Sequence, residues 1–416
     1  MFRRKFITRN IFLLGLVSFF TDMSSEMLYP VMPLFFASVG LSAVAMGMIE
    51  GVAEAVAGIS KSFFGHLGDR LGRPEWFVRI GYGLSAVSKP LLGFVTSPAA
   101  FIAIRSADRF GKGIRTAPRD AILAGESQQK VRGRVFGFHR FMDTFGAAVG
   151  PLLALVIIAV FSLYDQLSAI FIFALVPGLA AVALTFMVRS HVKKPVVSRA
   201  VLHEAMRSYL GIFKPALYTP TYRKLLVGLV LVGIFNSSDA FLLLRASELV
   251  GSRQEIFGFP IENAIIVIGL YIIFNIAYAL LSLVVGSLAD ARGYRNTFIA
   301  GLVAFAIAYS LLSRELSIGG LLLAFVIYAL FAAVNDGLVK AWLSRQLPKE
   351  RLGTGLGVAN TVISLSFLVS SVVTGIIWEV FSSSAALSVM AIGMIVPIAY
   401  ILMVIPRREP DAGQAT

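Results

Sequence analysis

The nine residues GHLGDRLGR, from Gly65 to Arg73, correspond to the first nine of a later stretch, GSLADARGYR, from Gly286 to Arg295. The two copies align without a gap, so that an aspartate, Asp69, pairs with Asp290 and a glycine, Gly72, pairs with Gly293. Each pair is separated by 221 residues, slightly more than half of the 416-residue chain. A repeat of this period predicts a chain built from two similar halves.

The composition is that of a membrane protein. Hydrophobic residues make up 57% of the chain and charged residues 14%, and the mean hydropathy is +0.82. A single soluble core would not need so much apolar surface, so the surplus is expected to face lipid. Apolar runs of spanning length recur between short polar loops, and helices satisfy their own backbone hydrogen bonds in lipid. We therefore predict an all-α polytopic membrane protein with twelve transmembrane helices. The expected spans are residues 11–38, 44–66, 76–95, 98–122, 134–160, 167–189, 223–250, 263–289, 294–313, 317–343, 353–380 and 384–405.

The net charge of +14 follows the predicted topology. In a soluble protein it would suggest nucleic acid, but here the basic residues occupy every second loop, whereas the opposite loops hold little beyond Arg253 and Arg314. The positive-inside rule then predicts that both termini are cytoplasmic and that the chain crosses the inner membrane an even number of times. No nucleic-acid partner is expected. The basic loop residues include Arg3, Arg4, Lys5, Arg9, Lys130, Arg132, Arg134, Lys193, Lys194, Arg199, Arg292, Arg295, Lys349, Arg351, Arg407 and Arg408.

The longest polar connection, residues 190–222, lies near the middle of the chain. It is predicted to be a cytoplasmic linker between an N-terminal six-helix bundle, residues 1–189, and a C-terminal six-helix bundle with a short cytoplasmic tail, residues 223–416. The fourth span is heavily charged and fails a plain hydropathy test. It must nevertheless cross, because otherwise the basic loops on either side of it would fall on opposite faces of the membrane.

The sequence offers few residues that could carry out enzymatic chemistry. The chain has no cysteine, its four histidines form no zinc-binding pair, and no glycine-rich loop matches the pattern that holds phosphates. We therefore expect no metal, no cofactor and no catalytic residues.

The two loop copies resemble the cytoplasmic signature loop of the major facilitator superfamily, which occurs once in each half of its members. The resemblance covers all twelve spans and implies two pseudo-symmetric six-helix bundles that alternate in opening a central site. It also implies that the loops gate the cytoplasmic side and that the protein is a monomer. The gating-loop residues are expected to be Gly65, Asp69, Arg70, Gly72, Arg73, Gly286, Asp290 and Gly293.

A second motif, GAAVGP from Gly146 to Pro151, lies in the fifth span. It resembles the glycine and proline motif of family members that exchange substrate for protons, but Leu153 and Ala154 replace its later glycines. Small residues four apart also allow two helices to approach closely, so a packing role explains the motif equally well.

The fourth span carries charges at steps of three and four residues, which places them along one side of a helix. Each charge at the bilayer centre costs about 2.5 to 3.5 kcal/mol, so the stripe is expected to line a wet cavity or to be paired. The stripe consists of Arg105, Asp108, Arg109, Lys112, Arg115 and Arg119.

Acidic partners for the stripe occur in the first two spans, where Asp22 and Glu26, and likewise Glu50 and Glu54, are four residues apart. The family fold implies that the first and fourth spans of each half line the central cavity. In the second half the polar candidates are Asn236, Asp239 and Asp336. His139, Arg140 and Asp143 in the fifth span are expected to be structural, with a proton relay as the alternative.

The resulting prediction is a secondary active transporter for a small organic solute, working by alternating access and by proton-coupled efflux. The basic stripe would contact an anionic or zwitterionic group of the substrate, and Asp22 or Glu26 would carry the proton. Three alternatives stay open: proton-coupled uptake or facilitated diffusion of an organic anion, a permanent salt-bridge network in place of a binding site, and a non-transporting receptor or scaffold.

Overall fold

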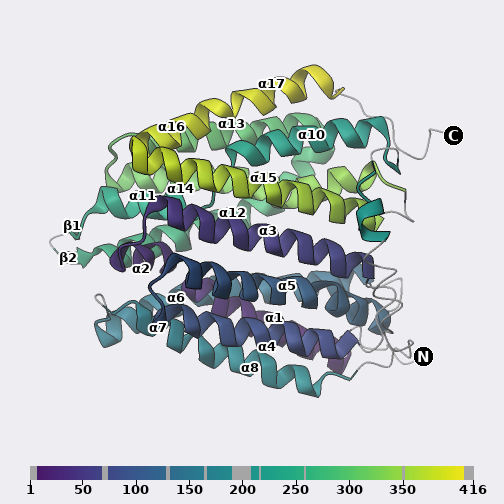
Figure 1. Ribbon diagram of the computed structural model, residues 1–416, viewed down its shortest axis with the longest axis horizontal. Coiled ribbons are helices and arrows are strands. Elements are labelled where there is room, and N and C mark those ends of the chain that lie inside the picture. Colours follow the sequence, from purple (N-terminus) through teal and green to yellow (C-terminus); the bar gives the residue numbers. More distant parts are fainter. Residues whose placement is uncertain are drawn as a thin grey trace. The chain divides into compact units, whose positions relative to one another are not determined.

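The computed structural model describes residues 7–67, 74–127, 132–163, 166–189, 208–214, 217–256, 259–348 and 352–406 (Figure 1). Within these ranges the chain forms long helices and one antiparallel hairpin. The helices of the first half are α1 (Arg9–Leu28), α2 (Met32–Ser38), α3 (Ala43–Leu67), α4 (Pro74–Leu91), the 3-10 turn η2 (Leu92–Phe94), α5 (Pro98–Glu126), α6 (Arg132–Phe161), α7 (Ser168–Phe173) and α8 (Leu175–Met187). The elements of the second half are α10 (Pro220–Phe235), α11 (Ala240–Val250), β1 (Arg253–Ile256), β2 (Phe259–Glu262), α12 (Asn263–Arg292), α13 (Tyr294–Leu312), α14 (Ile318–Arg345), α15 (Leu352–Val380), α16 (Ser383–Gly393) and α17 (Ile395–Val404).

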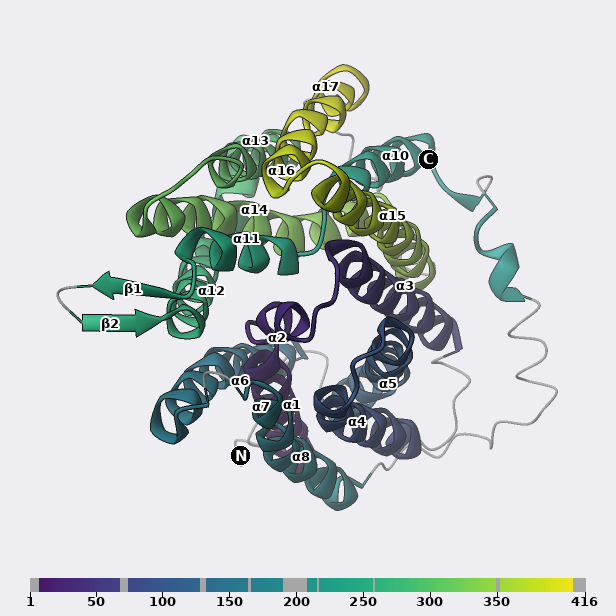
Figure 2. The ribbon, with the colours of Figure 1, turned by 60° about the vertical axis from the view of Figure 1, so that its left-hand side comes forward.

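These helices confirm the predicted class of all-α polytopic membrane protein. Among the described residues, ten helical segments are long and apolar enough to cross a membrane. The third and fourth predicted spans do not qualify, although α4 has 18 residues and α5 has 29. Charge explains their failure, since α4 carries Glu75, Arg79 and Lys89 and α5 carries the predicted stripe. The two charged helices pack against each other (Figure 2).

Several predicted spans are interrupted, and two of the interruptions extend over more than one residue. The first span is interrupted between α1 and α2, next to Pro30, which has no backbone N–H to continue a helix. The seventh span is interrupted between α10 and α11, at residues 236–239. There the short polar side chains of the sequence NSSD compete for backbone hydrogen bonds, and the hydroxyl of Ser238 accepts from the N–H of Ala240 at 3.3 Å. The predicted spans 11–38 and 223–250 correspond to the membrane-length segments Arg9–Ser38 and Pro220–Val250, and the breaks within them were not predicted.

The chain folds into two compact units. Unit 1 comprises Met1–Phe35 and Val56–Gly211, and unit 2 comprises Phe36–Ala55 and Ile212–Thr416. In unit 1, α1 packs against α6 and α8, and α4 packs against α5 and α8. In unit 2, α10 packs against α15 and α17, and α13 packs against α14, α16 and α17. Spans at corresponding positions of the two halves thus have corresponding neighbours, as expected for a repeated bundle.

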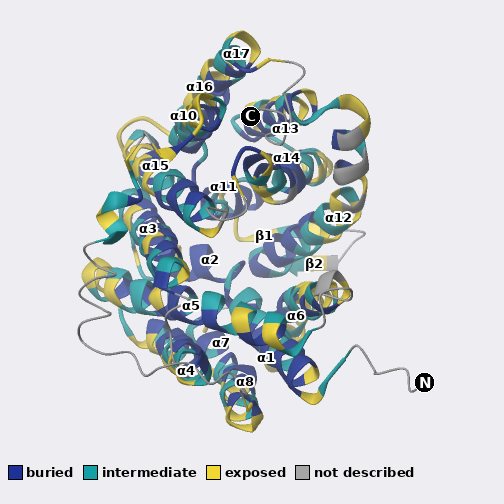
Figure 3. Ribbon diagram, turned by 90° about the vertical axis from the view of Figure 1, so that its right-hand side faces the viewer, coloured by how far each residue is buried: buried dark blue, intermediate teal, exposed yellow. Residues whose placement is uncertain are grey.

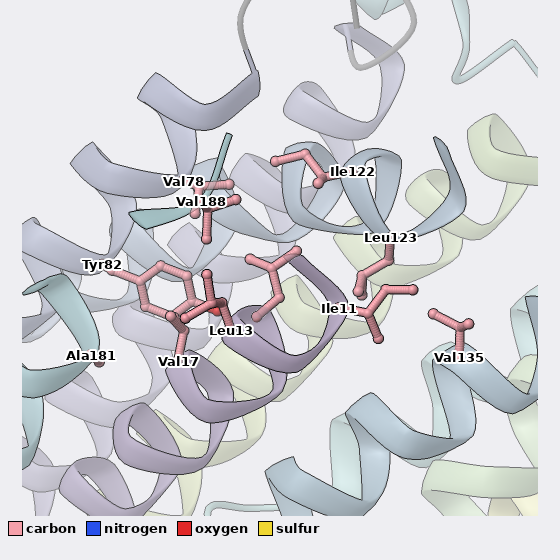
Figure 4. Close-up of a cluster of buried hydrophobic side chains, with 11 residues drawn as sticks. Ile11, Leu13, Val17, Val78, Tyr82, Ile122, Leu123, Val135, Ala181 and Val188 are labelled. Atoms are coloured by element: carbon pink, nitrogen blue, oxygen red, sulfur yellow. The ribbon is translucent and has the colours of Figure 1, made fainter. Parts of the chain in front are cut away.

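A cluster of buried apolar side chains from α1, α4, α5, α6 and α8 packs together at one end of unit 1 (Figure 4). Its members include Ile11, Val17, Tyr82 and Leu123. At the same end Glu126 in the last turn of α5 accepts hydrogen bonds from Thr8 at 3.1 Å and Asn10 at 2.8 Å. These contacts fix where α1 begins relative to α5. Large apolar side chains on outward helix faces, such as Val160, Phe186 and Met403, are exposed, as expected for surface that meets lipid (Figure 3).

The glycines of the fifth span allow α6 to approach α1 closely. A Cβ atom on Gly146 would collide with the backbone of Phe19, and one on Gly150 would collide with the backbone of Met23 and Met27. The GAAVGP motif therefore has a packing role in unit 1, which is one of the two explanations left open by the sequence.

Candidate functional site

The charged stripe of α5 is directed into unit 1. The side of α5 that carries it is buried: Arg105 is 4% exposed, Asp108 6% and Arg115 5%. The helix begins with Ser97, whose hydroxyl accepts from the N–H of Ala100, followed by proline at the first helical position. Its charged residues therefore avoid lipid, as the cost of exposing them there requires.

Part of the stripe is paired. Arg105 and Asp108 form an ion pair with a distance of 3.3 Å between Nη1 and Oδ2. Arg115 is bound to α4: its Nη1 donates to Ser85 Oγ at 2.6 Å and to the Gly81 carbonyl at 3.4 Å. The guanidinium carbon of Arg115 also lies 4.4 Å from the ring centroid of Tyr82. These contacts join α5 to α4, and they resemble the structural network that was the alternative to a binding site.

A buried lysine that was not predicted from the sequence, Lys89, lies near the ion pair of Arg105 and Asp108. Lys89 in α4 is 2% exposed, and its Nζ donates to the Thr21 carbonyl at 3.3 Å and to Ser24 Oγ at 3.2 Å in α1. The carboxylate of Asp108 interacts electrostatically with Lys89. A single lysine in the otherwise apolar run from Gly81 to Leu92 could have revealed it, because a charge in such a run is costly without a partner.

Acidic groups from α1 and α6 approach the same region. The carboxyl group of Asp22 in α1 lies within hydrogen-bonding reach of that of Asp143 in α6, and Lys112 of the stripe interacts electrostatically with Asp22. Ser18 Oγ donates to Asp143 Oδ1 at 2.5 Å. Glu26 lies one turn after Asp22 and also acts on it electrostatically. The structure thus brings Asp22, Glu26 and the stripe together inside unit 1.

The acidic pair of the second span is placed in a different unit. Glu50 is buried and Glu54 is half-buried, and both fall in the part of α3 that belongs to unit 2. Beside them, Gly47 and Gly51 bring α3 against the backbone of α15. Pairing of Glu50 or Glu54 with the stripe stays a prediction.

In unit 2 the candidates Asn236 and Asp239 lie in the break between α10 and α11. Two tyrosine hydroxyls hold this break: that of Tyr309 lies 3.2 Å from Ser237 Oγ, and that of Tyr328 donates to Asp239 Oδ1 at 2.5 Å. The Oδ1 atom of Asn236 is buried without a hydrogen-bond partner. The break therefore presents polar groups inside an otherwise apolar bundle.

Aromatic rings surround that break. The ring of Tyr328 lies within 6.1 Å of the rings of Phe274, Phe305, Tyr309 and Phe331, measured between centroids. The third candidate of this half, Asp336 in α14, is exposed and accepts from the hydroxyl of Tyr278 at 3.2 Å. The ring of Tyr278 stacks on that of Phe274 at the edge of this cluster, with 6.3 Å between the centroids.

A second buried cation was also missed. Arg245 in α11 donates to the Leu312 carbonyl at 3.0 Å, to Ser383 Oγ at 3.1 Å and to the carboxylates of Glu248 and Glu315 at 3.2 and 3.1 Å. It therefore joins α11 to the ends of α13 and α16. Only the pairing with Glu248, three residues on, could be read from spacing, because its other side-chain partners lie about 70 and 140 residues away.

The gating loops are only partly described. Asp69, Arg70, Gly72 and Arg73 lie outside the described residues. Gly286 and Asp290 lie in α12, and the side chain of Asp290 is outside the description. Gly65 lies in the last turn of α3. Gly293 ends α12 with a φ of +87°, and its N–H donates to the Ala289 carbonyl at 2.9 Å. That backbone conformation strongly favours glycine, which gives the last glycine of the repeated loop a physical reason.

No group of three or more metal-ligating side chains occurs within the parts of the chain that the structure describes. Two bundles of membrane-length helices with the same packing order, each with polar groups in its interior, define the class of polytopic membrane carriers.

Comparison with known proteins identifies the family. The family model described as Major Facilitator Superfamily matches residues 14–277 and 249–416. An uncharacterised MFS-type transporter of Methanocaldococcus jannaschii is 33% identical over 380 residues, which cover 90% of this chain and 89% of that protein. The chain therefore belongs to the major facilitator superfamily, and it is a multi-pass membrane transporter.

More distant relatives match shorter segments. A staphyloferrin B transporter of Staphylococcus aureus is 30% identical over 35% of both chains. A multidrug resistance efflux pump homologue of Lactococcus lactis is 25% identical over 34% of this chain and 36% of its own. Among solved structures, a variant of the nucleoside transporter NupG superposes with a TM-score of 0.77 at 13% identity and covers 96% of this chain and all of that one. This structural likeness concerns the fold.

Proposed function

We propose that this transporter exports a small organic solute that bears an anionic group, in exchange for protons. The observation that carries the proposal is the charged cluster inside unit 1, where acids from α1 and α6 meet bases from α4 and α5. Charges within a membrane are costly and are found where they serve a pathway or a pairing. In a transporter, a cluster containing both protonatable acids and fixed cations supports a shared role in coupling and binding.

Within the cluster, Lys112 is the cation that we assign to the substrate. Arg105 is paired with Asp108, and Arg115 is bound to α4. Lys112 is half-buried on the same side of α5 and acts on Asp22. A substrate anion beside Lys112 would weaken the attraction between Lys112 and an ionised Asp22, and this gives substrate and proton a direct electrostatic link.

Export as the direction of transport is supported by two observations. The fifth span carries part of the motif that resembles those of proton antiporters, and one relative is described as a multidrug resistance efflux pump homologue. Uptake or facilitated diffusion of an organic anion is the competing proposal. The basic loops support an inner-membrane location with both termini in the cytoplasm. We expect the transporter to act as a monomer.

The experiment is proton movement in inverted membrane vesicles energised to an acidic interior, with a panel of anionic, zwitterionic and cationic compounds. Wild type is expected to release protons from the vesicles in response to an anionic or zwitterionic compound, and Asp22→Asn is expected not to respond. Lys112→Gln should abolish the response while folded protein stays abundant. Loss of folded protein in Lys112→Gln would support the salt-bridge network instead. A proton movement of opposite sign would support uptake.

A further inference from the structure

Two carboxyl groups of unit 1 lie within hydrogen-bonding reach of each other: that of Asp22 in α1 and that of Asp143 in α6. The helix turns that carry them are in contact, since Ser18, one turn before Asp22, donates to Asp143 Oδ1 at 2.5 Å. Two carboxylates at this separation repel each other strongly in a medium of low dielectric constant. A carboxylate has no hydrogen to donate, so the two groups can form a hydrogen bond only when one of them is protonated.

The hydrogen-bond donors that the structure shows around these two carboxyl groups bind Asp143. Asp143 accepts from Ser18 Oγ at 2.5 Å through Oδ1 and from Arg140 Nη1 at 3.2 Å through Oδ2. Both of its oxygens are thus bound by donors that stabilise a negative charge. The proton of the shared bond is accordingly placed on Asp22, which donates it to Asp143.

Charged groups from each neighbouring helix act on the pair. From α5, Lys112 acts on Asp22 and Arg119 acts on Asp143, and from α4, Lys89 interacts with Asp22. Within α1 and α6 themselves, the charged and titratable neighbours are Glu26, His139 and Arg140. Arg119 is also paired with Asp120 at 2.9 Å, and Lys89 also interacts with Asp108, so the balance of a second negative charge depends chiefly on Lys112 and Arg140 when the proton leaves.

The backbone sets the distance between the two carboxyl groups. Gly146 follows Asp143 by one helical turn and brings α6 against Phe19, which precedes Asp22 by one turn. The helices α1 and α6 are tightly packed beside the pair, so the position of the two side chains is set by helix packing and does not depend on a loop.

We propose that the coupling proton is carried by Asp22 and shared in a hydrogen bond with Asp143, which accepts that bond as an ionised carboxylate. This inference rests on the proposed proton coupling and adds to it a residue and a position for the proton. When the proton leaves, two carboxylates face each other across the α1–α6 contact. Their repulsion gives proton release a direct mechanical effect on how these two helices pack.

The test follows the proton itself and needs no knowledge of the substrate. Infrared difference spectra of the purified, reconstituted protein are recorded as the pH is raised, and they report the carbonyl band of protonated carboxyl groups. Wild type is expected to lose the band of one carboxyl per molecule. That band should be absent or shifted in both Asp22→Asn and Asp143→Asn. It should persist in Glu26→Gln, which removes the neighbouring acid but keeps both carboxyl groups of the pair.

Three other results would overturn the proposed pair. An unchanged band in Asp143→Asn, from protein that elutes as a single folded species, would place the proton on Asp22 alone and overturn the pair. A band lost in Glu26→Gln and kept in the two aspartate variants would move the proton to Glu26 and also overturn it, while proton coupling would survive. Absence of any titrating carboxyl in wild type would overturn both the pair and the proposed coupling by these acids.

Discussion

The hydroxyl of Tyr328 in α14 donates a 2.5 Å hydrogen bond to Asp239, at the point where the seventh span is broken. A second hydroxyl, that of Tyr309 in α13, lies 3.2 Å from Ser237 in the same break. The helix interruption is therefore held by neighbouring helices of its own unit. Non-helical backbone within a membrane is tolerated where polar partners satisfy it, and these contacts supply them.

Tyr328→Phe should lower the thermal stability of the purified protein while leaving the ring packing intact. A hydrogen bond to a charged group contributes about 1.5 to 3 kcal/mol, and only the hydroxyl is removed. Tyr278→Phe is the matched control, because it removes a hydroxyl that donates to the exposed Asp336 at 3.2 Å. Thermal unfolding followed by tryptophan fluorescence should show the larger shift for Tyr328→Phe. Equal shifts would mean that the break does not depend on Tyr328.

Arg115→Lys tests whether this member of the charged stripe is structural. Lysine cannot keep both the Ser85 hydrogen bond and the stacking on Tyr82, because it lacks the planar guanidinium. We expect a loss of about 1 to 3 kcal/mol in stability, seen as a lower yield of folded protein in detergent. Lys340→Gln, at an exposed position of α14, should have little effect. Normal yield together with lost transport would instead indicate that Arg115 binds substrate.

Gly146→Ala should separate α1 from α6. The added methyl group would collide with the backbone carbonyl of Phe19, and neither helix can yield without moving. Gly137→Ala in the same helix has nothing within 4 Å of the added atom and should be neutral or stabilising, since alanine favours helix by about 1 kcal/mol over glycine. The measurement is the unfolding temperature of each variant. Similar values for the two would show that the glycine contact carries no stability.

Arg245→Lys should destabilise unit 2. The arginine is buried and binds groups of α11, α13 and the start of α16, and lysine cannot reach all of them. We expect a loss of at least about 2 kcal/mol, because each hydrogen bond to a charged group contributes about 1.5 to 3 kcal/mol. Arg253→Gln breaks an exposed ion pair with Glu262 and should cost less than about 1 kcal/mol. Limited proteolysis at increasing temperature would rank the two, and the opposite order would contradict the structural role of Arg245.

Much of the fold could be predicted from local sequence. The predicted fourth span, 98–122, became α5 (Pro98–Glu126) even though its hydropathy fails, because the alternation of basic loops required a crossing. The repeat singled out Gly293 as a gating-loop residue, and that role stays a prediction, whereas its positive φ is a local requirement for glycine that the repeat did not reveal. The helix breaks were missed, since the motif NSSD at residues 236–239 can also be accommodated within a helix when its partners differ.

The candidate site was predicted in part. Periodicity along one helix was sufficient to place Arg105, Asp108 and Arg115 on one buried side of α5. It could not show that Arg115 binds α4, or that Lys89 lies between α4 and α1, because those contacts join segments far apart in the chain. Whether the remaining charges bind substrate is a matter for the transport experiment.

The sequence by itself determined the membrane class, the two-fold repeat, the family and the presence of charges inside the spans. Each of these depends on composition, spacing or motif along the chain, and a bilayer converts such local patterns directly into spans. Only the tertiary structure decided the partners of those charges. The contact between Asp22 and Asp143 depends on α1 packing against α6 at Gly146, and the contact between Tyr328 and Asp239 depends on the bundle around α14. Side-chain pairing between helices is set by their packing, which no periodicity within one helix specifies.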